Sequence, residues 1–209
     1  MSFEINEPMV RKLLEVVDQG LVQGLGIPEP GKLCVEAAIS YALGEPHSDG
    51  PSCVEQDVRQ SKIALNDAPG WSSDAARAKG LRAVAIAQLG SRGVVDGQRY
   101  LALLAEKVIR RIVPIAMRAA AAKNPKHAAA LEAAAVRCEQ EGTLESARAA
   151  HAAAYAAYAD AAAYAAAAKR DEMYSLLASL MVETLGELGS PGCDWLWLVD
   201  ESAVGAKGN

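Results

Sequence analysis

Four residues have side chains whose types could do chemistry: Cys34 in the second predicted helix, His47 and Asp49 in the loop after it, and Cys53 at the start of the third predicted helix. The segment 52–55, SCVE, has the pattern of a capping box, in which Ser and Glu each satisfy the other's amide. It predicts a helix that starts at Cys53, where the helix dipole and the free amides would stabilise a thiolate. Because His47 lies six residues upstream, Cys53 and His47 are candidate catalytic residues of a thiol-dependent site.

The same four residues offer two sulfurs, one imidazole and one carboxylate, a set that could bind a transition metal. Their spacing, Cys34-x12-His47-x5-Cys53, is not that of a standard zinc site. A structural interpretation is also open, in which each cysteine is buried on one of two packed helices and His47 lies on the surface. The sequence thus identifies Cys34, His47, Asp49 and Cys53 as candidate metal ligands but favours the structural interpretation, and it predicts no cofactor.

A second candidate site is a stripe on the alanine-rich helix of the second half. Arg148, His151, Tyr155 and Tyr158 are spaced three or four residues apart, so they share one helical face. Tyrosine gives a large contact area at little cost in side-chain entropy, which is typical of interaction surfaces. The stripe is therefore a candidate binding surface for a partner protein or a second copy. The alternative is that the tyrosines fill a core otherwise lined by alanine.

The C-terminal segment 193–199 is the most hydrophobic short run in the chain. Trp195 and Trp197 flank Leu196 there, and we expect the segment to fold back and cap the helices, supplying bulk that alanine lacks. In the alternative, it is a docking element, and Trp195 and Trp197 are candidate binding residues. No Walker loop, HExxH or GxSxG motif accompanies these features.

The elements that must position these residues are helical almost throughout. Ala, Leu, Glu, Lys, Arg and Gln favour helices, and Gly and Pro fall mainly between the periodic segments. We find no convincing strand. The predicted helices span about 7–19, 30–44, 53–66, 73–89, 96–118 with a bend at Pro114, 125–141 and one or two helices from about 143 to 189.

The composition predicts how these helices pack. The chain has 209 residues, of which 43 are Ala and only ten are aromatic. The short loops favour one all-α domain, residues 1–209, of seven or eight mostly antiparallel helices. Within it we expect a Leu/Val-cored half over about 1–118, an alanine-rich half over about 119–190 and the Trp segment 193–199.

Charge and chain ends limit the partners. The net charge is −5 and is spread evenly along the chain, so the clustered Lys and Arg of a general nucleic-acid binder are missing. The first residues have no secretory signal pattern, and the stretch 147–168 is too rich in Ala and charge to span a membrane. We therefore expect a cytoplasmic protein that does not associate with membranes and whose cysteines are free thiols.

The alanine-rich segment 147–158, ARAAHAAAYAAY, resembles helices of bacterial all-helical immunity proteins in composition. This resemblance implies a cytoplasmic protein that binds a partner protein without catalysis, and it assigns no functional residue. The leading interpretation is thus a non-catalytic helical binding protein of the kind that includes immunity proteins and inhibitors, acting through protein–protein contacts. The alternative is a small thiol- or metal-dependent enzyme or sensor that uses Cys53, His47 and Cys34.

Overall fold

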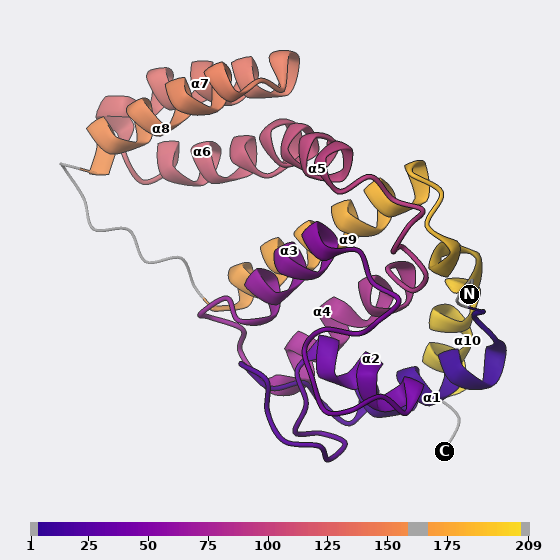
Figure 1. The fold of residues 1–209 in the computed structure, drawn as a ribbon. Helices are drawn as coiled ribbons and strands as arrows, with labels where there is room; N and C mark the ends of the chain where they lie inside the picture. The colour runs from indigo at the N-terminus through magenta and orange to yellow at the C-terminus, as the bar shows by residue number, and fades with distance from the viewer. Residues whose placement is uncertain (1–3, 159–166, 206–209) are drawn as a thin grey trace. The chain divides into compact units, whose positions relative to one another are not determined.

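The computed structural model describes residues 4–158 and 167–205, and the regular structure in these ranges is helical (Figure 1). No strand occurs among the described residues, and the β-type pairing there is a single isolated bridge between Gly26 and Leu33. The prediction of an all-α, multi-helix fold is confirmed. The α-helices are α1 (Glu7–Asp18), α2 (Val35–Leu43), α3 (Gln56–Asn66), α4 (Asp74–Ala87), α5 (Gly97–Arg111), α6 (Val113–Ala121), α7 (Ala128–Glu141), α8 (Leu144–Tyr158), α9 (Ala167–Glu187) and α10 (Trp197–Gly205). Two short 3₁₀ helices, η1 (Pro125–His127) and η2 (Pro191–Trp195), complete the set.

Several helix ends follow the sequence signals. Asn6 and Ser73 cap α1 and α4 by accepting amide hydrogen bonds with their side chains. Gly44 and Gly142 end α2 and α7 in the left-handed conformation that glycine adopts without strain. The predicted bend at Pro114 is a break, because α5 ends at Arg111 and Pro114 lies in the first turn of the separate helix α6.

Two predicted helix starts are wrong. The second helix starts at Val35 and not near residue 30, because Leu33 pairs with Gly26 as an isolated bridge and holds the preceding segment in turns. The third helix starts at Gln56 and not at Cys53. The Ser52 amide and hydroxyl both donate to the Glu45 carboxylate, so Ser52 does not cap a helix. Glu55 is the N-cap instead, and its carboxylate accepts from the amides of α3.

The chain divides into two compact units, which are described separately. The large unit comprises Met1–Leu101 and Ala167–Asn209, and the small unit comprises Ala102–Ala166. The alanine-rich sequence begins near residue 119, but the small unit already begins at Ala102 and ends at Ala166. The boundary at Ala102 lies within α5, so this helix belongs partly to each unit. The single folding domain expected from the sequence stays a prediction.

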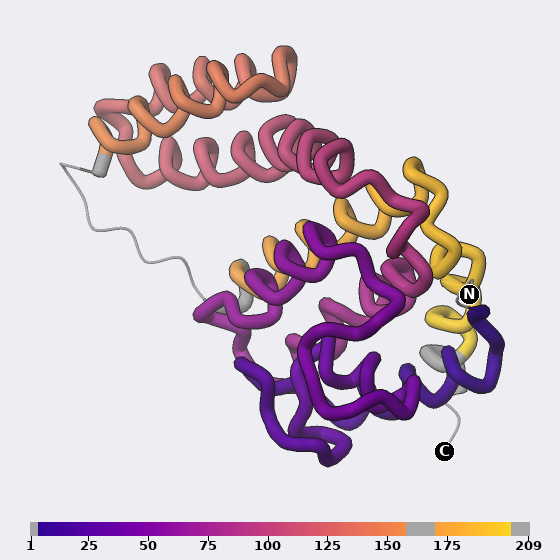
Figure 2. The backbone as a smooth tube through the Cα atoms, in the orientation of Figure 1, coloured from indigo at the N-terminus to yellow at the C-terminus, as the bar shows by residue number. Residues whose placement is uncertain are grey.

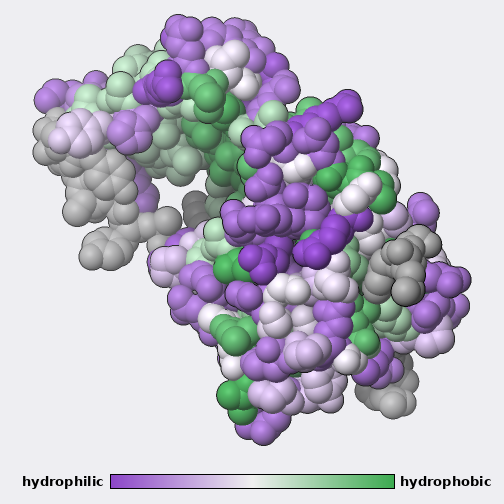
Figure 3. Space-filling view, in the orientation of Figure 1, coloured by the Kyte–Doolittle hydropathy of each residue, from purple (hydrophilic) through white to green (hydrophobic). Residues whose placement is uncertain are grey.

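In the large unit, α4 is the central helix and packs against α1, α2, α9 and η2. Helix α9 comes from the far end of the sequence and returns alongside α4 (Figure 2). The viewed face of this unit is mostly hydrophilic, with hydrophobic residues scattered over it (Figure 3). Its fully buried apolar side chains come from both stretches of sequence and include Leu13, Leu21, Leu33, Ile39, Leu81, Ile86, Leu89, Tyr100, Leu180 and Met181.

Trp71 joins α3, α4 and α9 within the large unit. Its indole Nε1 donates to the Leu65 carbonyl at the end of α3, at 2.9 Å, and its ring centroid lies 5.0 Å from that of Tyr174 on α9. The ring also lies over Gly80 of α4, where a β-carbon would be 2.5 Å from it. Trp71 is therefore a loop residue whose ring packs against the end of α3 and against α4 and α9.

In the small unit, α6, α7 and α8 pack against one another. The buried cluster between them contains few large side chains: its members are Ile109, Met117, Leu131, Ala134, Ala135, Cys138, Ala150 and Ala157. Arg110 covers the C-terminus of α7, where its guanidinium donates to the carbonyls of Glu139, Gln140 and Glu141 at 2.7–3.0 Å. These carbonyls have no partner within the helix, so Arg110 satisfies them and also complements the negative end of the helix dipole.

Candidate functional site

The chemical constellation predicted from the sequence does not assemble as one site. His47 is exposed, and its Nε2 lies 3.2 Å from the Gly26 carbonyl oxygen. Cys34 and Asp49 line one small pocket, whereas Cys53 and His47 are not among its lining residues. The described residues, which include all four of these side chains, contain no group of three or more His, Cys, Asp or Glu arranged to hold a metal ion. The predicted metal ligands are thus not brought together.

Cys53 lacks the environment that a reactive thiol needs. It lies in a turn before α3, is only 2% exposed, and does not occupy the first position of a helix. Burial raises the pKa of the Cys53 thiol to about 11, against weaker opposing effects from the Gly90 backbone and Lys62. Because the thiolate is the nucleophile, a raised pKa lowers reactivity. The reason for proposing Cys53 with His47 as a catalytic pair therefore no longer holds.

Cys34 acts as a helix cap. It is the N-cap residue of α2, and its sulfur accepts a hydrogen bond from the Ala37 amide at 3.3 Å. Burial raises the pKa of the Cys34 thiol, and the amides of Ala37 and Glu36 oppose this only in part. The pocket beside Cys34 has a volume of about 20 Å³, which is room for about one water molecule and not for an organic substrate.

The polar centre of the large unit is an ion pair that sequence reasoning missed. Lys62 Nζ of α3 lies 2.8 Å from Glu36 Oε1 of α2, and both side chains are fully buried. Burial raises the pKa of Glu36 and lowers the pKa of Lys62, while each charge counteracts the shift of the other. Cys34 and Cys53 also lie near enough to Lys62 to raise its pKa. The two predicted cysteines therefore belong to one buried polar cluster, with Lys62 between α2 and α3.

This cluster can position helices, but a solute cannot reach it, since neither charged side chain is exposed.

The sequence indicates in part that these two side chains are buried. Lys62 lies on the same stripe of α3 as Val58 and Leu65, both buried. Glu36 lies in VEAAISYAL, a helix apolar on nearly all sides and therefore expected to be buried. A Glu and a Lys in predicted helices are nonetheless usually solvated, which hid the pair.

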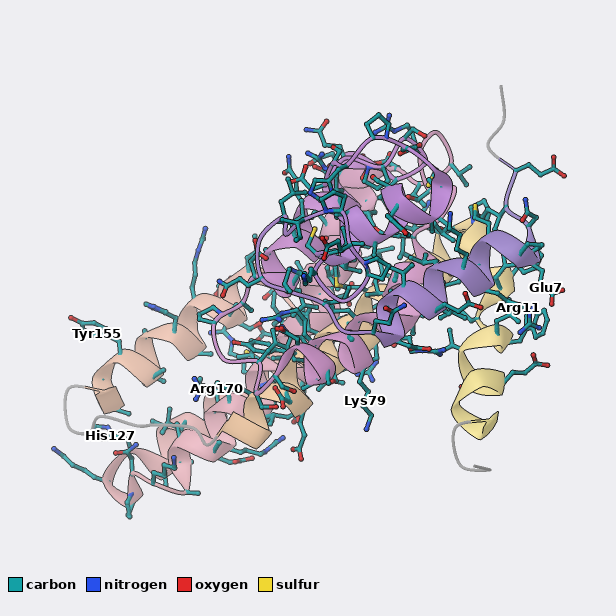
Figure 4. All side chains as sticks on the ribbon, turned by 90° about the horizontal axis from the view of Figure 1, so that it is seen from below. Glu7, Arg11, Lys79, His127, Tyr155 and Arg170 are labelled. Atoms are coloured by element: carbon teal, nitrogen blue, oxygen red, sulfur yellow. The ribbon has the colours of Figure 1, made fainter. Side chains whose placement is uncertain are left out.

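The predicted stripe on α8 lies on the surface of the small unit. Tyr155 is 74% exposed and projects away from the helix (Figure 4). Arg148 and His151 are exposed on the same face, and Leu144, which sequence reasoning missed, extends this face with 65% exposure. Tyr155 therefore does not fill the alanine-lined core. The side chain of Tyr158 lies outside the described residues.

The two tryptophans of the C-terminal segment are in the large unit and so do not belong to the same unit as the α8 stripe. Trp195 ends η2 half-buried, and Trp197 begins α10 with 46% exposure. The guanidinium carbon of Arg11 lies 6.0 Å from the Trp197 ring centroid, a cation–π contact. Both η2 and α10 pack back onto the unit, η2 against α4 and α10 against α1.

No described helix has the length and apolar character needed to cross a membrane. No protein-family model matches the chain, and neither the curated proteins nor the solved structures contain a match to it.

Proposed function

We propose that the protein is a non-catalytic helical binding protein that acts through protein–protein contacts. Its binding surface is the α8 stripe, defined as Leu144, Arg148, His151 and Tyr155. The observation that supports this most is the exposure of Tyr155, at 74%, on the helical face whose other end is the similarly exposed Leu144. Tyrosine and arginine are, with tryptophan, the residue types enriched among the positions that dominate binding energy at protein interfaces.

The composition of the small unit adds support. Its buried cluster consists largely of alanine, so a large aromatic side chain turned outward is not explained by packing within the unit. Leu144 and Tyr155 lie on one helical face and leave two apolar side chains available to a partner. The thiol-dependent alternative has lost its main support, because the Cys53 thiol is buried with a raised pKa. Cytoplasmic location and an immunity or inhibitor role stay predictions.

The test is site-specific photocrosslinking in the native cell. A benzophenone amino acid replaces Tyr155 in one variant and the exposed Ala133 of α7 in a control. We expect a protein adduct at position 155 and none at position 133. Equal labelling at the two positions, or none at either, would contradict the proposal.

The partner protein that the crosslink identifies is then purified, and its affinity for the parent protein and for variants is measured. The double variant Leu144→Ala/Tyr155→Ala should weaken binding at least tenfold, whereas Val136→Ala, on α7 outside the stripe, should leave it unchanged. Because Leu144 and Tyr155 are exposed, the double variant should lose no more than about 0.5 kcal/mol of unfolding free energy per substitution. A folded double variant that binds like the parent would refute the proposal.

A further inference from the structure

The arginines of the small unit differ in whether the unit itself supplies their carboxylate partners. Three of them form ion pairs with glutamates of the same unit at N–O distances of 2.6–3.0 Å: Arg110 with Glu106, Arg118 with Glu132 and Glu139, and Arg137 with Glu141 and Glu145. Arg148, in contrast, has no ion pair or hydrogen bond with another side chain among the described residues. Its exposed guanidinium therefore lacks the carboxylate that these other arginines have.

The spacing of the α8 stripe indicates the shape of a partner that could provide a carboxylate for Arg148. Leu144, Arg148, His151 and Tyr155 follow one another at intervals of four, three and four residues, the spacing of a seam along which a second helix packs. At 1.5 Å per residue, Leu144 and Tyr155 are about 16 Å apart along the helix axis. The seam thus has an apolar side chain at each end and two basic side chains between them.

We infer that the α8 stripe binds an acidic amphipathic helix of a partner protein. A carboxylate of that helix pairs with Arg148, and its apolar side chains contact Leu144 and Tyr155. Arginine is suited to this role because its planar guanidinium can bind a carboxylate through two parallel hydrogen bonds. The inference rests on the proposed function and adds the chemistry of the partner.

A second copy of the chain fits the stripe less well. An antiparallel pairing that places Leu144 against Tyr155 of the other copy necessarily places Arg148 against His151, because the two pairs share one midpoint in the sequence. Both copies of Arg148 would then lie near the symmetry axis without a carboxylate in the seam. Like charges juxtaposed in this way disfavour association.

The test uses three synthetic helical peptides and the full-length protein. All three peptides carry leucines at the two ends of a heptad stripe, and the positions between hold Glu, Gln or Lys. Fluorescence anisotropy should show the Glu peptide binding at least tenfold more tightly than the Lys peptide, with the Gln peptide between them. The difference should shrink as salt is raised, since exposed charges are screened.

Variants of the protein then test which residue causes the preference for the Glu peptide. Arg148→Gln should abolish the difference between the peptides and Arg148→Glu should reverse it, whereas Arg118→Gln, outside the stripe, should preserve it. Equal affinities for the Glu and Lys peptides, or a preference that survives Arg148→Glu, would overturn the inference. A concentration-dependent dimer in sedimentation experiments that Tyr155→Ala abolishes would assign the stripe to self-association instead.

The two proposals fail in distinguishable ways. If crosslinking at position 155 identifies a partner whose binding needs Leu144 and Tyr155, but the peptides show no charge preference, only the acidic-helix inference is wrong. If crosslinking yields no adduct and no peptide binds, the proposed function is wrong as well.

Discussion

At the scale of residues, the Glu36–Lys62 ion pair is the interaction in the large unit whose disruption should cost the most stability. Both side chains are fully buried at 2.8 Å, and the buried Ser40 hydroxyl, one turn after Glu36 on α2, has no hydrogen-bond partner among the described residues. Removing water from two charges costs several kcal/mol per ion, which the attraction between them offsets only in part. Such a pair adds little net stability while it is intact, but removing one partner leaves the other charge buried without compensation.

A double-mutant cycle on this pair follows from that balance. Glu36→Leu and Lys62→Met should each lower the unfolding free energy by about 3–5 kcal/mol, because each leaves one buried charge uncompensated. The double variant, which replaces both charges by apolar groups of similar size, should be close to the parent in stability. Urea denaturation followed by circular dichroism measures all four proteins. Additive losses in the double variant would show that the two charges are not coupled.

Cys53 allows a pH prediction. Its folded-state pKa of about 11 lies above the ordinary value of 9.0, so the folded state holds the proton more tightly than the unfolded state does. This contribution to stability is complete below about pH 9 and is lost as the pH rises to about 11. At pH 8 the thiolate fraction should be about 100-fold lower than in urea-unfolded protein, and the iodoacetamide reaction should be slower by at least this factor because burial also limits access.

The labelling is read peptide by peptide with mass spectrometry. Cys193 is the matched comparison, because burial raises its pKa to about 11 as well while its side chain is only half-buried. Cys53 should react more slowly than Cys193 at every pH where the chain is folded. A titration of Cys53 reactivity centred at or below pH 8.5 would contradict the assignment of Cys53 as an inert buried thiol.

At the scale of elements, glycines show where helices approach closely. The α4–α9 contact needs Gly80, because a β-carbon there would meet the Trp71 ring at 2.5 Å and the Ser175 hydroxyl at 3.0 Å. A β-carbon added at Gly186 of α9 would have the Cys193 sulfur as its nearest neighbour, at 4.0 Å. A β-carbon would therefore clash with neighbouring atoms at Gly80, whereas there is room for one at Gly186.

The same substitution should accordingly have opposite effects at the two positions. Gly80→Ala should destabilise the protein by about 1–3 kcal/mol, the usual range for overpacking. Gly186→Ala should stabilise it by up to about 0.5–1 kcal/mol, because alanine is the better helix former where space allows. Thermal unfolding of the two variants side by side tests both signs. A stabilising Gly80→Ala would mean that Trp71 does not pack on α4 as described.

At the scale of the whole molecule, the two units differ in what they bury. The large unit buries leucine, isoleucine, valine and methionine from both ends of the sequence. The small unit's buried cluster has Ile109, Met117 and Leu131 as its large members, and the others are alanine or cysteine. Alanine removes less apolar area from water than leucine, so hydrophobic stabilisation per residue is lower in the small unit.

Local stability should follow this difference. We expect backbone amides of α6, α7 and α8 to exchange with deuterium faster than those of α1, α2 and α4, because regions with little buried apolar area open at lower free energy. Hydrogen–deuterium exchange resolved by mass spectrometry measures both units in one sample. Equal protection in the two sets of helices would show that the alanine cluster packs well enough to compensate for its smaller area.

The sequence by itself determined the helical fold and several helix caps. These features depend on local helix propensity, on cap residues such as Asn6, Ser73 and Gly142, and on spacings of three and four residues. Each of these signals acts between residues that are close in the sequence. The spacing also places Arg148, His151 and Tyr155 on one face of α8, but it leaves open whether the tyrosine points outward or into the alanine-lined core.

Only the tertiary structure decided which side chains are buried and with what partners. Ser52 and Glu55 satisfy the local pattern of a capping box, yet Glu45 takes the Ser52 hydroxyl and moves the start of α3 to Gln56. Glu36 and Lys62 are 26 residues apart in the sequence, and no local signal couples their charges. Long-range contacts of this kind depend on how the helices pack, and packing decided that Cys53 is an inert buried thiol while Tyr155 is a surface residue.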